Sequence, residues 1–122
     1  MRKFLKLVLM MLLLVALTNI QKSFCQEIME PFPGVKMKVL TENEHVKVFE
    51  VTVVPGATAD WHSHPQHTIY ALTDISMKIE EKEKQPYIIE LKKGESKWFP
   101  AVTHKISNSG KKSFIAIFTE IK

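Results

Sequence analysis

Four of the five histidines in this 122-residue chain stand where they could share one metal ion. His62 and His64 are separated by one residue on a predicted strand, so both side chains point to the same face. His67 follows a predicted turn at Pro65, and His104 lies on a later predicted strand. Imidazoles gathered in this way would bind a divalent ion, with iron, manganese, zinc, nickel and copper all open. A His-x-His pair can instead be solvated on a surface strand, so spacing alone leaves metal binding undecided.

The single cysteine limits what other chemistry the chain can perform. Cys25 ends an N-terminal segment that we expect to be removed, which leaves a mature chain without cysteine. Such a chain forms no disulfide, and a metal site in it must use histidine, carboxylate or carbonyl ligands. Zinc-ribbon folds and thiolate nucleophiles are therefore excluded.

Residues 1–25 are typical of a secretory signal peptide. Arg2, Lys3 and Lys6 make a basic start, and residues 7–20 carry no charge. This uncharged stretch fits the apolar region of a signal peptide and is shorter than the roughly 20 residues of a membrane-spanning helix. We therefore expect an exported protein, periplasmic or secreted, with no stable membrane insertion after cleavage.

The predicted cleavage site follows Cys25. Small side chains belong at positions −3 and −1 of such a site, and Ser23 and Cys25 supply them when the mature chain begins at Gln26. Two alternatives stay open, namely an uncleaved membrane anchor and a lipoprotein acylated at Cys25.

The net charge of the chain is concentrated in this N-terminal segment. Of the 17 Lys and Arg residues, four lie in residues 1–25, so residues 26–122 carry 13 basic and 13 acidic residues. A formally neutral domain has no electrostatic footprint for a phosphate backbone, which argues against nucleic acid as a partner. The length of this part suits one domain and excludes two.

Residues 35–122 predict a series of short strands separated by turns. Apolar and polar residues alternate, as at Val35, Met37 and Val39, and no window shows the 3.6-residue period of a helix. Residues 26–34 contain two prolines and a glycine and predict a loop that leads into the domain. The pattern favours an all-β sandwich or closed barrel. The predicted strands are residues 35–39, 45–54, 57–64, 67–73, 76–81, 87–91, 95–99, 104–107 and 113–121.

Two blocks of sequence around the histidines resemble the paired motifs of the cupin superfamily. They are Gly56-x5-His62-x-His64 and Gly94-x5-Pro100-x3-His104, and the resemblance extends over residues 37–122. It implies a single-domain cupin jelly-roll β-barrel in residues 35–122. It also implies a mononuclear metal centre, because two His and a Glu of the first cupin motif and one His of the second usually hold a metal. His62 and His64 match the first pair, and His104 matches the second-motif histidine.

The sequence departs from the cupin pattern at the position of the glutamate. Counting back from Tyr70, His67 stands where that Glu would be, so the resemblance implies four ligands: His62, His64, His67 and His104. Neutral imidazoles leave the charge of a divalent ion uncompensated, which would favour an anionic ligand. Affinity should fall below about pH 6, where imidazoles take up protons. If His67 points away, three histidines remain, with open positions for substrate or dioxygen.

Resemblance to cupins implies metal-dependent chemistry on a small molecule, of a dioxygenase or isomerase kind. The alternative is a non-catalytic module that binds a small ligand or the metal itself, and a third possibility is a metal-free structural barrel. Apart from the histidines, Asp60 and Tyr70 are the acid or base candidates, and Asn108 is expected to bond a turn backbone. Residues 114–118 are apolar on both strand faces. Either both faces are covered within the barrel or one packs against a second subunit, and dimers are frequent among cupins, so we expect a homodimer.

Overall fold

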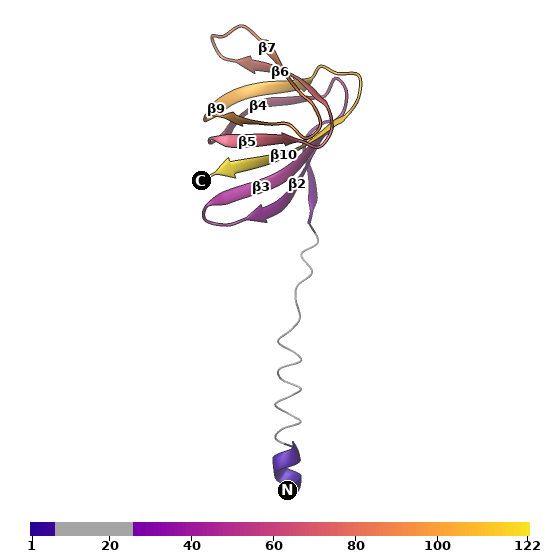
Figure 1. Cartoon of the computed structure of the whole chain (residues 1–122), viewed down its shortest axis with the longest axis vertical. Coiled ribbons are helices and arrows are strands. Elements are labelled where there is room, and N and C mark those ends of the chain that lie inside the picture. Colours follow the sequence, from indigo (N-terminus) through magenta and orange to yellow (C-terminus); the bar gives the residue numbers. More distant parts are fainter. Residues whose placement is uncertain (7–25) are drawn as a thin grey trace.

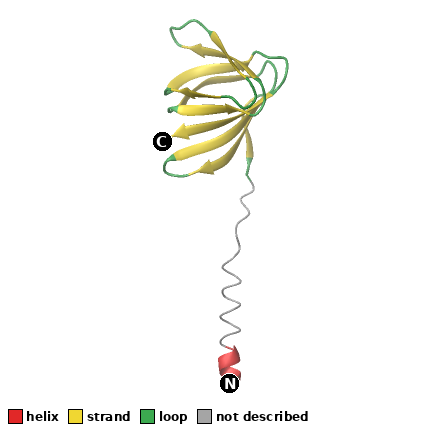
Figure 2. Ribbon diagram, in the orientation of Figure 1, coloured by secondary structure: helices red, strands yellow, loops and turns green. Residues whose placement is uncertain are grey.

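The computed structural model describes residues 1–6 and 26–122 of the chain. Residues 2–6 form a short helix, and residues 26–122 form a β-domain (Figures 1 and 2). Within these described ranges, no helix has the length and apolar character needed to cross a bilayer. The uncharged stretch and the cleavage site of the predicted signal peptide lie outside the described residues, so export stays a prediction.

Ten strands in the described domain form two antiparallel sheets that face each other. The six-stranded sheet has the order β1-β2-β3-β10-β5-β8, and the four-stranded sheet has the order β4-β9-β6-β7. This architecture confirms the predicted all-β jelly roll, and nine of the ten strands coincide with the predicted ones. The strands are β1 (Ile28–Phe32), β2 (Val35–Glu42), β3 (Val46–Val53), β4 (Thr58–His64), β5 (His67–Ala71), β6 (Ile75–Glu81), β7 (Tyr87–Leu91), β8 (Ser96–Phe99), β9 (Val102–Asn108) and β10 (Phe114–Ile121).

The loop predicted for residues 26–34 is wrong, because most of it forms strand β1. Prolines are tolerated here because β1 is an edge strand that pairs with β2 alone, and the pairing register shifts around Pro31. Pro33 and Gly34 make the tight turn between the two strands. Gly34 has a φ of 76°, and a Cβ there would lie 2.7 Å from Val54 Cγ2, so only glycine fits.

Strand β10 runs through the middle of the six-stranded sheet and carries much of the core. Its inward residues include Phe114 and Phe118, both buried, and the Phe118 ring stacks on Phe49 of β3 at 5.3 Å between centroids. Ile115 and Ile117 point to the outer face, where they are half-buried. The apolar character of both faces therefore has a partial explanation within one chain, and the homodimer stays a prediction.

Candidate metal centre

Three histidines from two neighbouring strands converge inside one end of the barrel. His62 and His64 lie on β4, and His104 lies on β9 directly opposite His62 in the strand register. Each of the three offers a ligand atom, and these atoms all lie within 4.8 Å of one another. This cluster could hold one metal ion, which agrees with three of the four predicted ligands.

A β-bulge turns the His pair toward the core. Ala59 pairs with Ile106, and His62 pairs with His104. Between these two pairs, β4 therefore contains one more residue than β9. Ala59 is buried, and without the extra residue strict alternation would carry Trp61 inward and His62 outward. The bulge reverses the alternation and points His62 and His64 into the barrel, while Trp61 is exposed.

His67 approaches the cluster from the other sheet. It begins β5, its side chain is fully buried, and its ring centroid lies 4.9 Å from that of His64. Its ring also stacks on Phe99 at 5.3 Å and on Phe118 at 5.9 Å between centroids. His67 is not one of the three residues whose ligand atoms lie within 4.8 Å of each other. Its role as a fourth ligand therefore stays a prediction.

Hydrogen bonds assign the tautomers of three of these rings. His62 Nδ1 lies 2.6 Å from the Asp60 carbonyl oxygen, and His67 Nδ1 lies 2.8 Å from that of Pro65. A carbonyl can only accept, so each Nδ1 carries the hydrogen and donates it. The same holds for His64 Nδ1, which lies 2.5 Å from Glu120 Oε1. In each neutral ring the free lone pair is then on Nε2, which is the atom left for a metal.

Two buried nitrogen atoms at the site have no partner among the described residues, namely Nε2 of His104 in the cluster and Nε2 of the neighbouring His67. Leaving a buried polar atom unpaired costs about 1–3 kcal/mol, and native structures rarely do so without a reason. A bound ion would satisfy such atoms, so the donor set fits a metal.

The surroundings of two of the histidines, His64 and His104, favour the neutral form of each ring. Burial, followed by the charges that His62, His64 and His67 would carry, lowers the pKa of His104 to about 3. Burial also lowers the pKa of His64, although the bond to Glu120 opposes this shift. Only a neutral imidazole can bind a metal, so both residues are ready to ligate at neutral pH.

A small cavity of about 70 Å³ adjoins the histidines between the two sheets. His62 and His64 form part of its wall, and the rest of the wall is apolar. The apolar residues include Phe32, Val35, Met37, Phe49, Ile106 and Phe118.

Neither of the two predicted acid or base candidates reaches the cluster with its side chain. Asp60 is exposed, and its carboxylate accepts a hydrogen bond from the backbone N–H of Trp61 at 2.9 Å. It does orient His62, but through its backbone carbonyl. Tyr70 is 44% exposed and alternates with the inward-facing Ile69 and Ala71, so it lies on the outer face of β5.

One acidic residue beside the cluster was not predicted from the sequence. Glu120 lies two residues beyond Phe118 on β10, and its side chain is 15% exposed. A period of two from Phe114 through Phe118 places Glu120 on the inner face. That signal was present in the sequence, and an inward acid at the end of a core strand could have been inferred from it.

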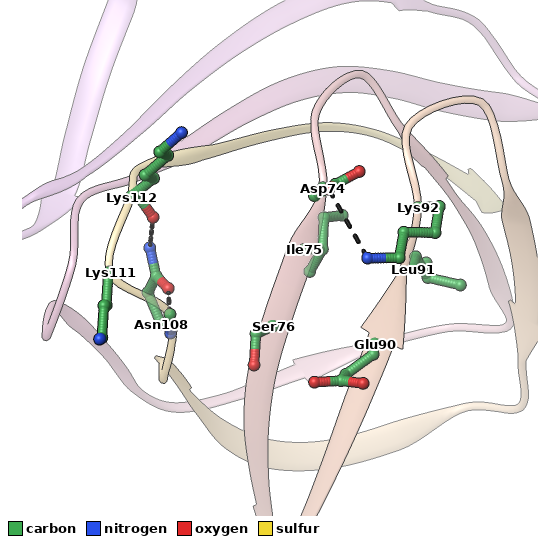
Figure 3. A pocket seen from close by; sticks show the side chains of 10 residues that line it. Asp74, Ile75, Ser76, Glu90, Leu91, Lys92, Asn108, Lys111 and Lys112 are labelled. Atoms are coloured by element: carbon green, nitrogen blue, oxygen red, sulfur yellow. Dashed lines mark hydrogen bonds and ion pairs between the residues drawn. The ribbon is translucent and has the colours of Figure 1, made fainter.

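A second pocket, of about 560 Å³, contains none of the histidines (Figure 3). Charged side chains surround it, including Asp74 and Lys92, whose charged atoms lie 3.8 Å apart. Asn108 lines it and donates to the carbonyl oxygens of Val53 at 2.9 Å and Lys112 at 2.8 Å. These bonds confirm the prediction that Asn108 supports backbone.

Comparison with known proteins decides the family. No protein-family model matches the chain, and no curated protein is significantly similar to it. Among solved structures, a cupin domain from Bordetella pertussis is 30% identical, with a TM-score of 0.68 over 77% of this chain and 98% of that one. The chain belongs to the cupin superfamily. The cupin barrel thus accounts for both motifs, and the predicted membership is confirmed.

Two further structures share the cupin fold with this chain. A cupin-like protein from Thermotoga maritima is 26% identical, with a TM-score of 0.60 over 84% of this chain and 80% of that one. The polyketide cyclase RemF from Streptomyces resistomycificus is 16% identical, with a TM-score of 0.62 over 80% of this chain and 74% of that one. The second likeness shows the fold alone.

Proposed function

We propose that this cupin binds one divalent metal ion through His62, His64 and His104, with His67 as a fourth ligand, and uses it to act on a small molecule. The observation that carries the proposal is the common orientation of the rings. His62, His64 and His67 each use Nδ1 for an oxygen acceptor and have no partner for Nε2 among the described residues. The buried Nε2 of His104 has no partner among them either. The buried nitrogens of a histidine that served the fold alone would be expected to have hydrogen-bond partners.

The chemistry would come from the ion and from the pocket around it. A divalent ion held there would supply a Lewis acid, and also a redox centre if the ion were iron or copper. The chain would contribute the rest. Its histidines hold the ion in a fixed geometry, and the rings of Phe49 and Phe118 stack against His64 and limit the approach of water.

The size and the apolar wall of the adjoining cavity favour a small and mainly apolar substrate. Its volume of about 70 Å³ holds a molecule of only a few heavy atoms, unless a larger one extends toward solvent. His62 and His64 are the polar part of the wall, so a polar or anionic group of the substrate would face the ion.

We favour a dioxygenase-like or isomerase-like reaction on grounds of family membership. The same fold occurs in a polyketide cyclase and in a predicted oxalate decarboxylase from Thermotoga maritima, which are 16% and 18% identical to this chain. The second candidate function is a non-catalytic module that binds a small ligand or the metal itself. The positions of Asp60 and Tyr70 favour it, because neither side chain reaches the cluster to act as an acid or base.

Metal analysis of protein from its native compartment tests the proposal, followed by substrate screening with and without air. We expect about one ion per chain in the parent and a strong loss in His62→Ala, with His45→Ala as the control because His45 is highly exposed. Iron or copper with oxygen-dependent turnover would support the enzyme, and zinc without turnover would support the binding module. A metal content below a tenth of an ion, before and after reconstitution, would contradict both.

Export and dimerisation are part of the same proposal. The intact mass of secreted material should correspond to a chain that begins at Gln26, and a chain that keeps residues 7–17 would contradict this. Light scattering at micromolar concentration should give the mass of a dimer, with the apolar outer face around Ile115 and Ile117 as the contact. A monomeric mass would contradict the predicted homodimer.

A further inference from the structure

Glu120 is the acidic residue whose side chain contacts the histidine cluster. Its Oε1 lies 2.5 Å from Nδ1 of His64, and the two side chains are only 15% and 11% exposed. Among the described residues, no lysine or arginine forms an ion pair with this carboxylate. A half-buried carboxylate of this kind needs partners, and the imidazole N–H is the one that the fold provides.

The backbone holds Glu120 in this place through its pairing with β5 and with the turn before that strand. On β10 it pairs with His67 of β5, and its side chain forms a hydrogen bond with His64. The next residue, Ile121, donates its N–H to the carbonyl oxygen of Gln66 at 3.0 Å. That bond ties the end of β10 to the turn that separates His64 from His67. Glu120 is therefore positioned by the same segment that positions the histidines.

His64 is oriented differently from the other two rings with assigned tautomers. His62 and His67 each donate to a backbone carbonyl two residues earlier, which is a local and uncharged contact. His64 donates to a carboxylate fifty-six residues away in the chain. Hydrogen bonds to a carboxylate are shorter and roughly twice as strong as those between neutral groups. Such a bond raises the electron density on the opposite nitrogen and so strengthens it as a metal ligand.

We propose that Glu120 is the positioning residue of the metal centre, holding His64 with Nε2 toward the cluster and supplying the negative charge that the neutral imidazoles lack. The inference rests on the function proposed above. It explains how a site without a glutamate in its first motif obtains a carboxylate. The charge is on Glu120 of β10. It acts on the site through the imidazole of His64, and Glu120 itself is not a ligand.

Glu81 offers a matched comparison. It is the register partner of His104 on β6 and its side chain is 14% exposed, much like that of Glu120. Its carboxylate, however, accepts a hydrogen bond from Tyr87 Oη at 2.7 Å and pairs with Lys84. It makes no hydrogen bond to a histidine among the described residues. Glu81→Gln therefore removes a nearby charge without removing a bond to the cluster.

Binding of Co(II) alone, measured by competition with a chelating dye at pH 7.5, tests the proposal. Glu120→Ala removes both the acceptor and the charge, and should weaken binding by about 10–100-fold. Glu120→Gln keeps an oxygen acceptor without the charge, and should recover part of that loss. Glu81→Gln should change the affinity by less than about threefold. Urea unfolding of each metal-free variant checks that the fold is kept.

Nitrogen-15 NMR of the histidine rings in metal-free protein gives a readout that a purely structural role would not move. His64 should be the Nδ1–H tautomer in the parent and in Glu120→Gln, and should shift toward a mixture in Glu120→Ala. An Nε2–H tautomer in the parent, or equal Co(II) affinity in the parent and Glu120→Ala, overturns the inference while the metal site stands. A parent that binds no Co(II) overturns the proposed function itself, and the metal role of Glu120 with it.

Discussion

Strand β9 carries two buried polar residues, and they differ in how their hydrogen bonds are satisfied. His104 is 4% exposed and Asn108 is 3% exposed, and both face the inside of the barrel. The amide of Asn108 donates twice to backbone carbonyls, and its Oδ1 accepts from the N–H of Gly110 at 2.9 Å. Nε2 of His104 has no partner among the described residues. All the hydrogen-bonding groups of the Asn108 amide have partners within the protein, whereas Nε2 of His104 would need a partner from outside the described residues.

This contrast distinguishes the two buried polar residues within one strand. Asn108 joins the end of β9 to the loop before β10, so its bonds serve the fold. His104 lies four residues away, in the same sheet and at similar burial, and the fold leaves its nitrogen free. Because burial is equal, burial alone cannot account for the difference. The free nitrogen fits the role of metal ligand proposed above.

The strongest test of the contrast is removal of the free nitrogen. His104→Ala deletes the only ligand of the three-His cluster that β9 contributes, so Co(II) affinity should fall by more than about 100-fold, beyond the usual effect of an outer-shell residue. The free energy of unfolding of the metal-free protein should change by less than about 2 kcal/mol, because the lost packing is offset by loss of an unpaired polar atom. Dye competition and urea unfolding measure the two quantities. Parent-like Co(II) affinity would place His104 outside the site.

The reciprocal test removes the satisfied residue. Asn108→Ala leaves two carbonyls and one N–H without partners, so the metal-free protein should lose about 2–4 kcal/mol of unfolding free energy. Co(II) affinity of the folded fraction should stay within threefold of the parent. Asn108→Asp is the matched control, since it keeps the acceptor for Gly110 but loses both donated bonds. An Asn108 variant that keeps its stability and loses metal would break the contrast.

A smaller effect is expected at His67, which shares the unpaired Nε2 but belongs to the other sheet. If it ligates, His67→Ala removes one of four bonds and Co(II) affinity should fall by about tenfold, less than in His104→Ala. His67→Glu should bind better than His67→Ala, since it restores a donor at the position that the resemblance to cupins assigns to a glutamate. Competition measurements at pH 7.5 on the three proteins decide this. Affinity equal to that of the parent in His67→Ala would make this a three-histidine site.

The sequence predicted which histidines gather, but it did not predict how the strands place them. Spacing and motif resemblance identified His62, His64 and His104, because alternation on strands and the two cupin blocks are local patterns. The bulge beside Asp60 could not be predicted, since it depends on the pairing of β4 with β9. That missing register also explains why the carboxylate of Asp60 was a candidate, whereas its backbone carbonyl is the group that orients His62.

The remaining differences arise from long-range pairing. Strand β1 was predicted as a loop because Pro31 and Pro33 signal a break, and only its place at a sheet edge makes them harmless. Tyr70 was a candidate because the register of its strand was not known; the pairing of β5 places it on the outer face, where it is 44% exposed. Glu120 has a clear inward position by alternation, yet its contact with His64 joins strands far apart in the chain.

The smallest expected effect is the dependence of stability on pH in metal-free protein. The pKa of His104 is lowered to about 3 in the fold, whereas an unfolded histidine titrates near 6.5. Above about pH 6.5 the residue is neutral in both states and contributes no slope. Between about pH 6.5 and 3, His104 takes up a proton in the unfolded chain but stays neutral in the folded chain. The free energy of unfolding should therefore fall as the pH falls.

His104→Ala should flatten this acid slope, and Asn108→Ala should keep it, because Asn108 does not titrate. Some slope should persist in His104→Ala, since burial also lowers the pKa of His64. Urea midpoints at pH 7.5, 6, 5 and 4 in the presence of a chelator measure the effect for each protein. If His104→Ala and the parent lose stability in parallel, the free nitrogen of His104 takes up its proton in the fold as readily as in the unfolded chain. The unpaired Nε2 of His104 would then have no effect on stability that distinguishes it from the paired amide of Asn108.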